Sequence, residues 1–206
     1  MKLKFILLLS GLLFTISAFA QKPSYGIKLG FNTAKWGIGE PTVTFKNKFR
    51  VGLVSGVNVD LPVSGQVTLQ SELLYSMFGS TFSKNSEYAK YKVNYLLLPV
   101  MAKYNLENGL SLLAGPQFGL LMSAKSNIDG DQYDFKDDMK KTDMFFVIGA
   151  DYKLQNGIVL GFRYQHGLTN TETDADVNFI KNRAFSMTAT YKLKHSFSET
   201  LNSIFK

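Results

Sequence analysis

Beyond residue 20, apolar and polar residues alternate along most of the chain with the period of two that is typical of β-strands. The alternating segments are residues 24–33, 48–60, 66–80, 90–105, 109–124, 142–154, 157–168 and 182–193. Each is at least as long as the roughly 9–11 residues with which a tilted strand crosses a bilayer. No stretch after residue 20 has the length of a membrane-spanning helix, so the pattern predicts an all-β chain of eight strands.

The connections between these segments alternate in length. Three are short, at residues 62–65, 107–108 and 155–156, and the last two run into Asn108-Gly109 and Asn156-Gly157, which are strong hairpin signals. The other four are long and polar, at residues 34–47, 81–89, 125–141 and 169–181. Short periplasmic turns opposite long outer loops are typical of outer-membrane proteins. The sequence therefore predicts a closed up-and-down eight-stranded antiparallel transmembrane β-barrel with both termini in the periplasm.

Each segment has an apolar face and a face of glycine, polar and charged residues. In residues 24–33 the apolar face holds Tyr25, Ile27, Leu29 and Phe31, and the other face holds Gly26, Lys28, Gly30 and Asn32. A membrane barrel turns the apolar face to lipid and encloses the polar face, and it carries aromatic girdles near the strand ends. The structural alternative is a soluble lipocalin-like barrel, in which the apolar face would line the interior.

The segment 90–105 is the hardest to orient, because residues 95–100 are almost continuously apolar. A slip of one residue would exchange its two faces. The predicted orientation places Lys103 inside and the following residues towards lipid: Leu96, Leu98, Val100, Ala102 and Tyr104.

The N-terminus predicts export. Lys2 and Lys4 precede an apolar stretch at residues 5–16, and Ala18-Phe19-Ala20 supplies a cleavage site, so residues 1–20 are interpreted as a cleaved signal peptide. A membrane-anchoring helix is the alternative, although the apolar run is short for one. The barrel domain is then expected at 21–193, followed by a periplasmic tail at 194–206.

Composition limits the chemistry further. The chain has no cysteine, which excludes disulfides, thiolate metal sites and a lipoprotein anchor. The formal charge is +7, and removal of Lys2 and Lys4 leaves +5. No basic helix or aromatic–arginine motif indicates a nucleic-acid partner. The expected partners are outer-membrane lipid and lipopolysaccharide, the barrel-assembly machinery during insertion, and a protein partner at the outer loops; no cofactor is expected.

The alternation places charged residues inside the predicted barrel. These lumen-facing charges are Lys28, Arg50, Asp60, Glu72, Asp151, Arg163 and Lys192. An eight-stranded barrel is only wide enough inside for its own side chains, so the charges must pair or hold water. They predict either a static network that makes the barrel rigid or a narrow ion path through it.

An acidic cluster lies in the third long connection. Asp129, Asp131 and Asp134 could offer oxygens to a divalent cation, but the spacing of Gly130 does not match an EF-hand and no glutamate closes the site. A solvated acidic loop, bridged by divalent ions to lipopolysaccharide, is the alternative interpretation, and no metal site is predicted.

Catalysis has two candidate bases, His166 and His195. His166 falls near the outer end of its segment, close in sequence to Asp174 and Asp176, but no spacing specifies a Ser–His–Asp site. We therefore expect no enzyme, with a lipid-modifying enzyme as the less favoured alternative.

The long connections also carry aromatic residues that are expected to be exposed on a binding surface. They are Trp36, Phe82, Tyr88 and Phe179. Loops held by a rigid barrel are natural binding surfaces.

Several motifs resemble the PorT-like outer-membrane β-barrel (porin-like) family of Gram-negative bacteria. They are Tyr95-Leu96-Leu97-Leu98-Pro99 with Lys103-Tyr104, Gly115-Pro116 with Gly119-Leu120-Leu121, and Gly161-Phe162-Arg163-Tyr164 with Gly167-Leu168-Thr169-Asn170. The likeness covers essentially the whole mature chain and implies an outer-membrane barrel without catalytic residues. One departure is that about 13 residues follow Leu193, where many such proteins end on an aromatic residue.

Together these features predict a structural, adhesive or binding role through the outer loops. The alternative is a narrow porin-like channel or an accessory subunit of a secretion system.

Overall fold

The computed structural model describes residues 23–38, 46–84, 87–128, 130–171 and 180–193. The predicted signal peptide and C-terminal tail lie outside these residues, as do Asp129, Asp174, Asp176, Phe179 and His195. Within them, no helix is long and apolar enough to cross a membrane.

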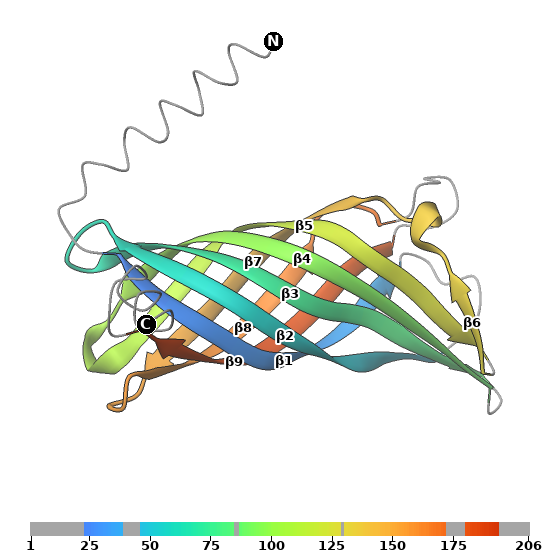
Figure 1. The fold of residues 1–206 in the computed structure, drawn as a ribbon, viewed down its shortest axis with the longest axis horizontal. Helices are drawn as coiled ribbons and strands as arrows, with labels where there is room; N and C mark the ends of the chain where they lie inside the picture. Colours follow the sequence, from blue (N-terminus) through green and yellow to red (C-terminus); the bar gives the residue numbers. More distant parts are fainter. Residues whose placement is uncertain (1–22, 39–45, 85–86, 129, 172–179, 194–206) are drawn as a thin grey trace, which may run out of the picture.

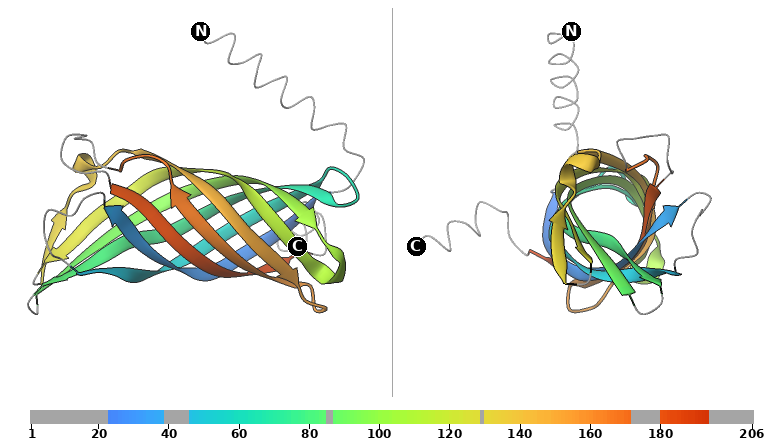
Figure 2. Two further views of the ribbon diagram at one scale, coloured as in Figure 1. Left: turned by 180° about the vertical axis from the view of Figure 1, so that it is seen from behind. Right: turned by 90° about the vertical axis from the view of Figure 1, so that its right-hand side faces the viewer.

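Eight strands form a closed antiparallel ring, seen end-on in Figure 2. The strands are β1 (Ser24–Ile38), β2 (Lys46–Pro62), β3 (Val67–Lys84), β4 (Glu87–Asn105), β5 (Leu110–Ile128), β7 (Thr142–Lys153), β8 (Ile158–Gly167) and β9 (Ile180–Lys192). Neighbours along the chain pair with each other, and β9 closes the ring against β1. A ninth strand, β6 (Asp131–Asp134), pairs only with the end of β5 and stands outside the ring (Figure 1). The predicted fold class is confirmed.

The three short connections lie together at one end of the barrel, which we call the turn end; the other is the loop end (Figure 1). Between β4 and β5 the short 3-10 helix Glu107–Gly109 reverses the chain, with positive φ at Asn108 (65°) and Gly109 (80°). Asparagine and glycine tolerate this left-handed backbone better than other residues. The Asn-Gly pair therefore fixes a tight turn where the sequence predicted one.

The wall of the barrel is apolar on its outer surface, as predicted. On β1, Leu29 and Phe31 are 58% and 50% exposed, whereas Lys28 on the opposite face of the same strand is 1% exposed. In β4, Leu98 and Tyr104 face outwards and Lys103 is buried in the lumen, which confirms the orientation predicted for this segment. The lipocalin-like alternative is wrong for this part of the wall.

The strands at the loop end run further than the sequence predicted. β1 continues to Ile38, β3 to Lys84 and β5 to Ile128, so much of three predicted loops is strand. The β1 and β5 extensions resemble polar loops in the sequence because each carries an outward lysine, Lys35 or Lys125. Lys35 faces outwards, while its neighbours Ala34 and Trp36 point inwards.

The expectation of exposed loop aromatics is therefore wrong for Trp36. Its side chain is 7% exposed and packs inside the barrel against the partly buried Phe82 and Tyr91. The Tyr88 side chain is outside the described part. Trp36 and Phe82 thus belong to the barrel interior rather than to its surface.

The barrel is taller than a membrane needs. A strand tilted by about 40° rises roughly 2.5 Å per residue, and the apolar band of such barrels is ~25 Å tall. The 19 residues of β4 therefore reach roughly twice the height of that band. The extra height lies at the loop end, where charged residues replace apolar ones on the outer surface.

Candidate functional site

The lumen is the candidate site, and its turn end is organised around Glu72 on β3. Lys28 from β1 donates to Glu72 Oε1 over 2.6 Å, and Arg163 from β8 donates to Glu72 Oε2 over 2.6 Å. The Glu72 side chain is 0% exposed. A carboxylate this deep is held by two cations, one on each oxygen, and such charge-assisted bonds are the strongest that side chains make.

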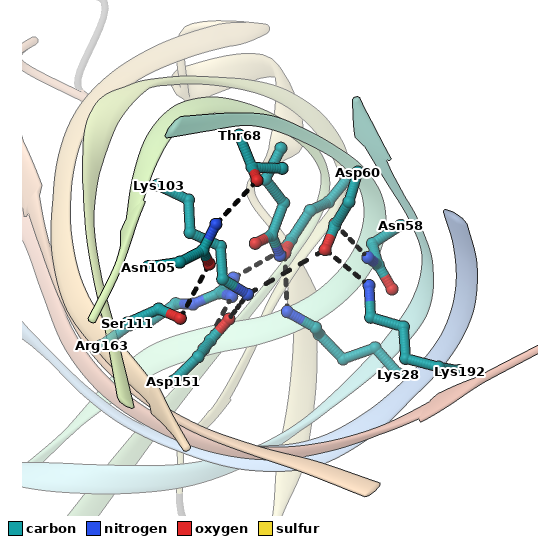
Figure 3. A network of polar contacts seen from close by, with 12 residues as sticks. Lys28, Asn58, Asp60, Thr68, Lys103, Asn105, Ser111, Asp151, Arg163 and Lys192 are labelled. Atoms are coloured by element: carbon teal, nitrogen blue, oxygen red, sulfur yellow. Dashed lines mark hydrogen bonds and ion pairs between the residues drawn. The ribbon is translucent and has the colours of Figure 1, made fainter. Parts of the chain in front are cut away.

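Two further carboxylates extend this pairing across the lumen (Figure 3). Asp151 lies 2.8 Å from Lys103 Nζ and 3.5 Å from Arg163 Nη2. Asp60 lies 2.7 Å from Lys192 Nζ and 4.0 Å from Lys103 Nζ. The ion pairs thus join four cations and three carboxylates into one continuous chain, which we call the charge network. Its members in order are Lys192, Asp60, Lys103, Asp151, Arg163, Glu72 and Lys28.

The charge network draws one residue from each strand of the ring except β5. β5 is joined to the same region by uncharged groups. Ser111 donates to Asn105 Oδ1 over 3.0 Å, and Asn105 donates to Thr68 Oγ1 over 2.9 Å (Figure 3). The network therefore ties the circumference of the barrel together from within.

Glycines on the lumen faces make room for these charges. A Cβ at Gly161 would lie 2.8 Å from Asp151 Oδ1, and one at Gly149 would lie 2.8 Å from Arg163 Cγ. Contacts under 3 Å require the neighbour to move. The glycines opposite Asp151 and Arg163 thus leave the space that lets the ion pair form.

The loop end of the lumen has the opposite character. Phe78, Tyr95 and Phe145 are each 0% exposed, with ring centroids 5.6–6.1 Å apart. Nearer the mouth, Trp36 packs against Tyr91 at 5.0 Å. We call this cluster the aromatic plug, and its members are Trp36, Phe78, Phe82, Tyr91, Tyr95, Phe135 and Phe145. The sequence reasoning missed it, because a polar interior was expected throughout.

A few polar groups sit beside the plug. Asn182 on β9 donates to Asp143 Oδ2 over 2.9 Å and lies 3.2 Å from the Tyr95 hydroxyl, and Thr169 donates to Asp143 Oδ1. Between plug and network, Gln117 donates to Gln165 over 3.0 Å. The polar groups inside the barrel are thus linked to each other as well as to the wall.

The structure brings six of the seven predicted lumen charges into the charge network, together with Lys103. The exception is Arg50, which lies nearer the loop end and donates to the backbone oxygen of Phe78 over 2.6 Å. The β2–β3 register shifts between Phe49 and Val54, so Arg50 lies in an irregular stretch of this ladder. Gly52, inside this stretch, is the signal in the sequence that could have indicated a bulge. Lys103 was placed inside by alternation but was not counted among the network residues.

The described members of the acidic cluster, Asp131 and Asp134, do not converge on a metal site. Asp131 and Asp134 are three residues apart on β6, so their side chains point to opposite faces of the strand. Within the described part of the chain, no three His, Cys, Asp or Glu side chains come close enough to hold a metal ion. The Asp134 carboxylate instead accepts from the backbone of Lys136.

His166 lies on the outer face of β8, away from the lumen. The inward positions of this strand are odd-numbered, from Val159 to Gly167, and His166 lies between two of them. Its Nδ1 is 3.1 Å from the Tyr164 hydroxyl. Its proposed partners, Asp174 and Asp176, fall outside the described residues, so the structure does not test a catalytic triad with them.

The comparisons with known proteins agree with this architecture. Two crystal structures of similar fold are Ail, the attachment invasion locus protein of Yersinia pestis, and Neisserial surface protein A. Ail is 13% identical with a TM-score of 0.50, and Neisserial surface protein A is 11% identical with a TM-score of 0.54. Each match covers 84% of this chain and 100% of the other. No curated protein matches the sequence.

The family comparison is more specific than the structural likeness. The model of the outer membrane protein beta-barrel domain matches residues 19–172, well over half of the 206-residue chain. The match runs from the predicted cleavage site through β8. Together with the closed eight-stranded ring, it identifies this chain as a β-barrel of the outer membrane and a member of the outer membrane protein beta-barrel domain family.

Proposed function

We propose that this protein is a sealed barrel that presents a binding surface at its loop end and does not conduct ions. The observation that carries this proposal is the filled lumen. The charge network closes the turn end, and the aromatic plug closes the loop end.

Each half of the lumen blocks ions in its own way. In the turn half, an ion would have to break pairs such as Lys28–Glu72, whose side chains are 1% and 0% exposed. In the loop half, the fully buried rings of Phe78, Tyr95 and Phe145 occupy the lumen, and apolar constrictions oppose the passage of hydrated ions. Two unlike barriers in series favour a closed barrel over a narrow pore.

The protruding wall supports the binding part of the proposal. β3 and β4 continue as a paired ladder up to Lys84 and Glu87, well above the apolar band. Rigid strands hold the connecting segments at a fixed height and spacing, which suits a surface for recognition. Ail, named for attachment and invasion, and Neisserial surface protein A have a fold of this kind. The proposal includes no catalysis, because the side-chain contact found for His166 among the described residues is with the Tyr164 hydroxyl and not with a carboxylate.

Conductance in planar bilayers tests the seal. The purified barrel should give no current steps above the baseline, under conditions in which a known porin, inserted in the same way, gives clear steps. Reproducible steps from the wild-type barrel would favour the narrow-channel alternative and overturn the proposal.

Cysteine labelling tests which end faces outwards, and the absence of native cysteine makes the background clean. Lys90→Cys lies at the loop end of β4, and Lys153→Cys lies at the turn end of β7. A membrane-impermeant maleimide should label Lys90→Cys in intact cells and Lys153→Cys only after the outer membrane is opened. The opposite result would place the proposed surface in the periplasm.

A further inference from the structure

The outer surface of the barrel changes abruptly in charge near the loop end. On β1, the outward residues Ile27, Leu29 and Phe31 are followed by Lys35, and on β9 Phe185 is followed by Arg183. The same change occurs on other strands. The described outward basic residues at this level are Lys35, Lys90, Lys92, Lys125, Lys181 and Arg183. Positive charge therefore lies directly above the apolar band, at the height of lipid headgroups.

One part of this level is hollowed. A hollow of about 470 Å³ opens on the outer wall where β1, β2, β7, β8 and β9 run side by side. Its lining residues are Lys35, Phe49, Ile148, Tyr164, Arg183 and Phe185. Four of the six offer apolar or aromatic surface, and the other two are cations.

The two cations of the hollow lie next to each other on adjacent strands. Lys35 and Arg183 are direct partners in the β1–β9 ladder, so their side chains leave the wall next to each other. Lys35 Nζ lies 4.7 Å from the centre of the Phe49 ring, a cation–π contact that holds the ammonium over the hollow. A Cβ at Gly37 would lie 2.9 Å from Arg183 Nε, so this glycine gives the guanidinium room to lie against the wall.

Neither cation is neutralised within the described part of the chain. The ion pairs found there lie inside the lumen and include neither Lys35 nor Arg183. A pair of adjacent cations, one of them a guanidinium with a planar fork of donors, matches a phosphate group. The aromatic and aliphatic floor below it matches an acyl chain.

We propose that this hollow binds a phosphorylated glycolipid of the outer leaflet, of the lipid A type. Lys35 and Arg183 contact its phosphate, and Phe49, Tyr164 and Phe185 contact the first part of an acyl chain. The floor distinguishes this ligand from free phosphate, because a small soluble anion makes no use of an apolar surface that continues into the lipid-facing wall.

Native mass spectrometry of the purified full barrel in detergent tests this proposal. The probes are bis-phosphorylated lipid A, the same lipid after removal of its phosphates, and inorganic phosphate. We expect lipid A adducts on the wild-type barrel, at least tenfold weaker binding of the dephosphorylated lipid, and no retention of inorganic phosphate. The double variant Lys35→Gln/Arg183→Gln should bind lipid A roughly 30-fold more weakly, as two basic residues near an anionic surface predict.

A matched control removes the same charge at the loop end of another strand. Lys90→Gln/Lys92→Gln alters β4, outside the hollow, and should weaken lipid A binding less than threefold. All these side chains lie on the outer surface, and a heat-dependent shift on a detergent gel verifies that each variant is folded. Equal binding of lipid A and its dephosphorylated form would overturn the proposal. So would equal losses in the two double variants, which would indicate a diffuse charge effect in place of a site.

Discussion

The two halves of this barrel wall follow opposite rules. In the turn half, apolar side chains such as Leu29 face outwards and charged ones such as Glu72 face inwards. In the loop half, Lys35 faces outwards and Trp36 inwards. The first is the pattern of a barrel in lipid and the second is that of a soluble protein. One continuous strand therefore has a lipid-facing part and a water-facing part. The interior of the barrel changes from charged to aromatic at the same level.

The turn half should be the more sensitive to loss of a single group. Glu72→Gln leaves Lys28 and Arg163 without the carboxylate that both contact, and breaking a buried pair in this way costs about 4–5 kcal/mol. The measurement is the free energy of unfolding in urea from lipid vesicles. Adding Lys28→Met should restore part of the loss, because it removes one unpaired cation. A loss under about 1 kcal/mol would mean that the turn half does not depend on its ion pairs.

The loop half should respond to lost volume. Phe145→Ala removes a fully buried ring that contacts Phe78 and Tyr95, and a cavity of this kind costs about 3–4 kcal/mol. Trp36 is the single tryptophan of the chain and belongs to the same plug, so its fluorescence reports this half specifically. Phe146→Ala, on the adjacent outward position, is the control and should cost less. Equal costs at the two positions would remove the distinction between plug and wall.

A smaller effect should follow from filling space in the turn half. Gly161→Ala places a methyl group 2.8 Å from Asp151 Oδ1 and from Thr188 Oγ1, and overpacking of this kind costs roughly 1–3 kcal/mol. Gly157→Ala meets no neighbouring atom but has a φ of +85°, so it separates backbone strain from crowding. Both are read out as the urea midpoint. A Gly161→Ala barrel as stable as wild type would show that the charge network can shift to accommodate a methyl group.

The smallest effect is expected on the outside. His166→Ala removes a contact with Tyr164 on the outer face of β8 and should change stability by less than about 0.5 kcal/mol. The urea midpoint of His166→Ala is compared with that of Gln165→Ala, which removes an inward neighbour. A larger effect at His166 than at Gln165 would contradict the assignment of the two faces.

Much of this architecture could be predicted from alternation alone. The period of two placed Lys28, Glu72 and Arg163 in the lumen, because residues that alternate with lipid-facing ones point to the inner face of the wall. It also oriented Lys103 correctly. Alternation does not show how far along the barrel axis each residue lies, because that position depends on the stagger between neighbouring strands. The sequence therefore did not reveal that Arg163 meets Glu72, 91 residues away, rather than another carboxylate.

The aromatic plug was missed for a related reason. Tyr91 lies between Lys90 and Lys92, and Trp36 directly follows Lys35. Such segments resemble exposed loops when the pattern of a lipid-facing wall is expected along the whole chain. Where the wall extends beyond the membrane, polar residues face outwards and apolar residues face inwards. The same alternation then predicts an apolar interior. The bulge near Arg50 has one weak signal in the sequence, Gly52, which lies inside the irregular stretch between Phe49 and Val54. That signal does not show that Arg50 donates to the Phe78 carbonyl.

The order of charges along the chain also bears on how the barrel is assembled. Asp60 and Glu72 belong to β2 and β3, whereas Arg163 and Lys192 belong to the last two strands. A bilayer penalises charge that is incompletely paired, and an N-terminal half entering lipid alone would hold Glu72 without Arg163 and Asp60 without Lys192. Insertion is therefore most favourable as a single cooperative event after β9 meets β1. The lumen charges make insertion of a partly formed barrel unfavourable and favour insertion of the closed barrel.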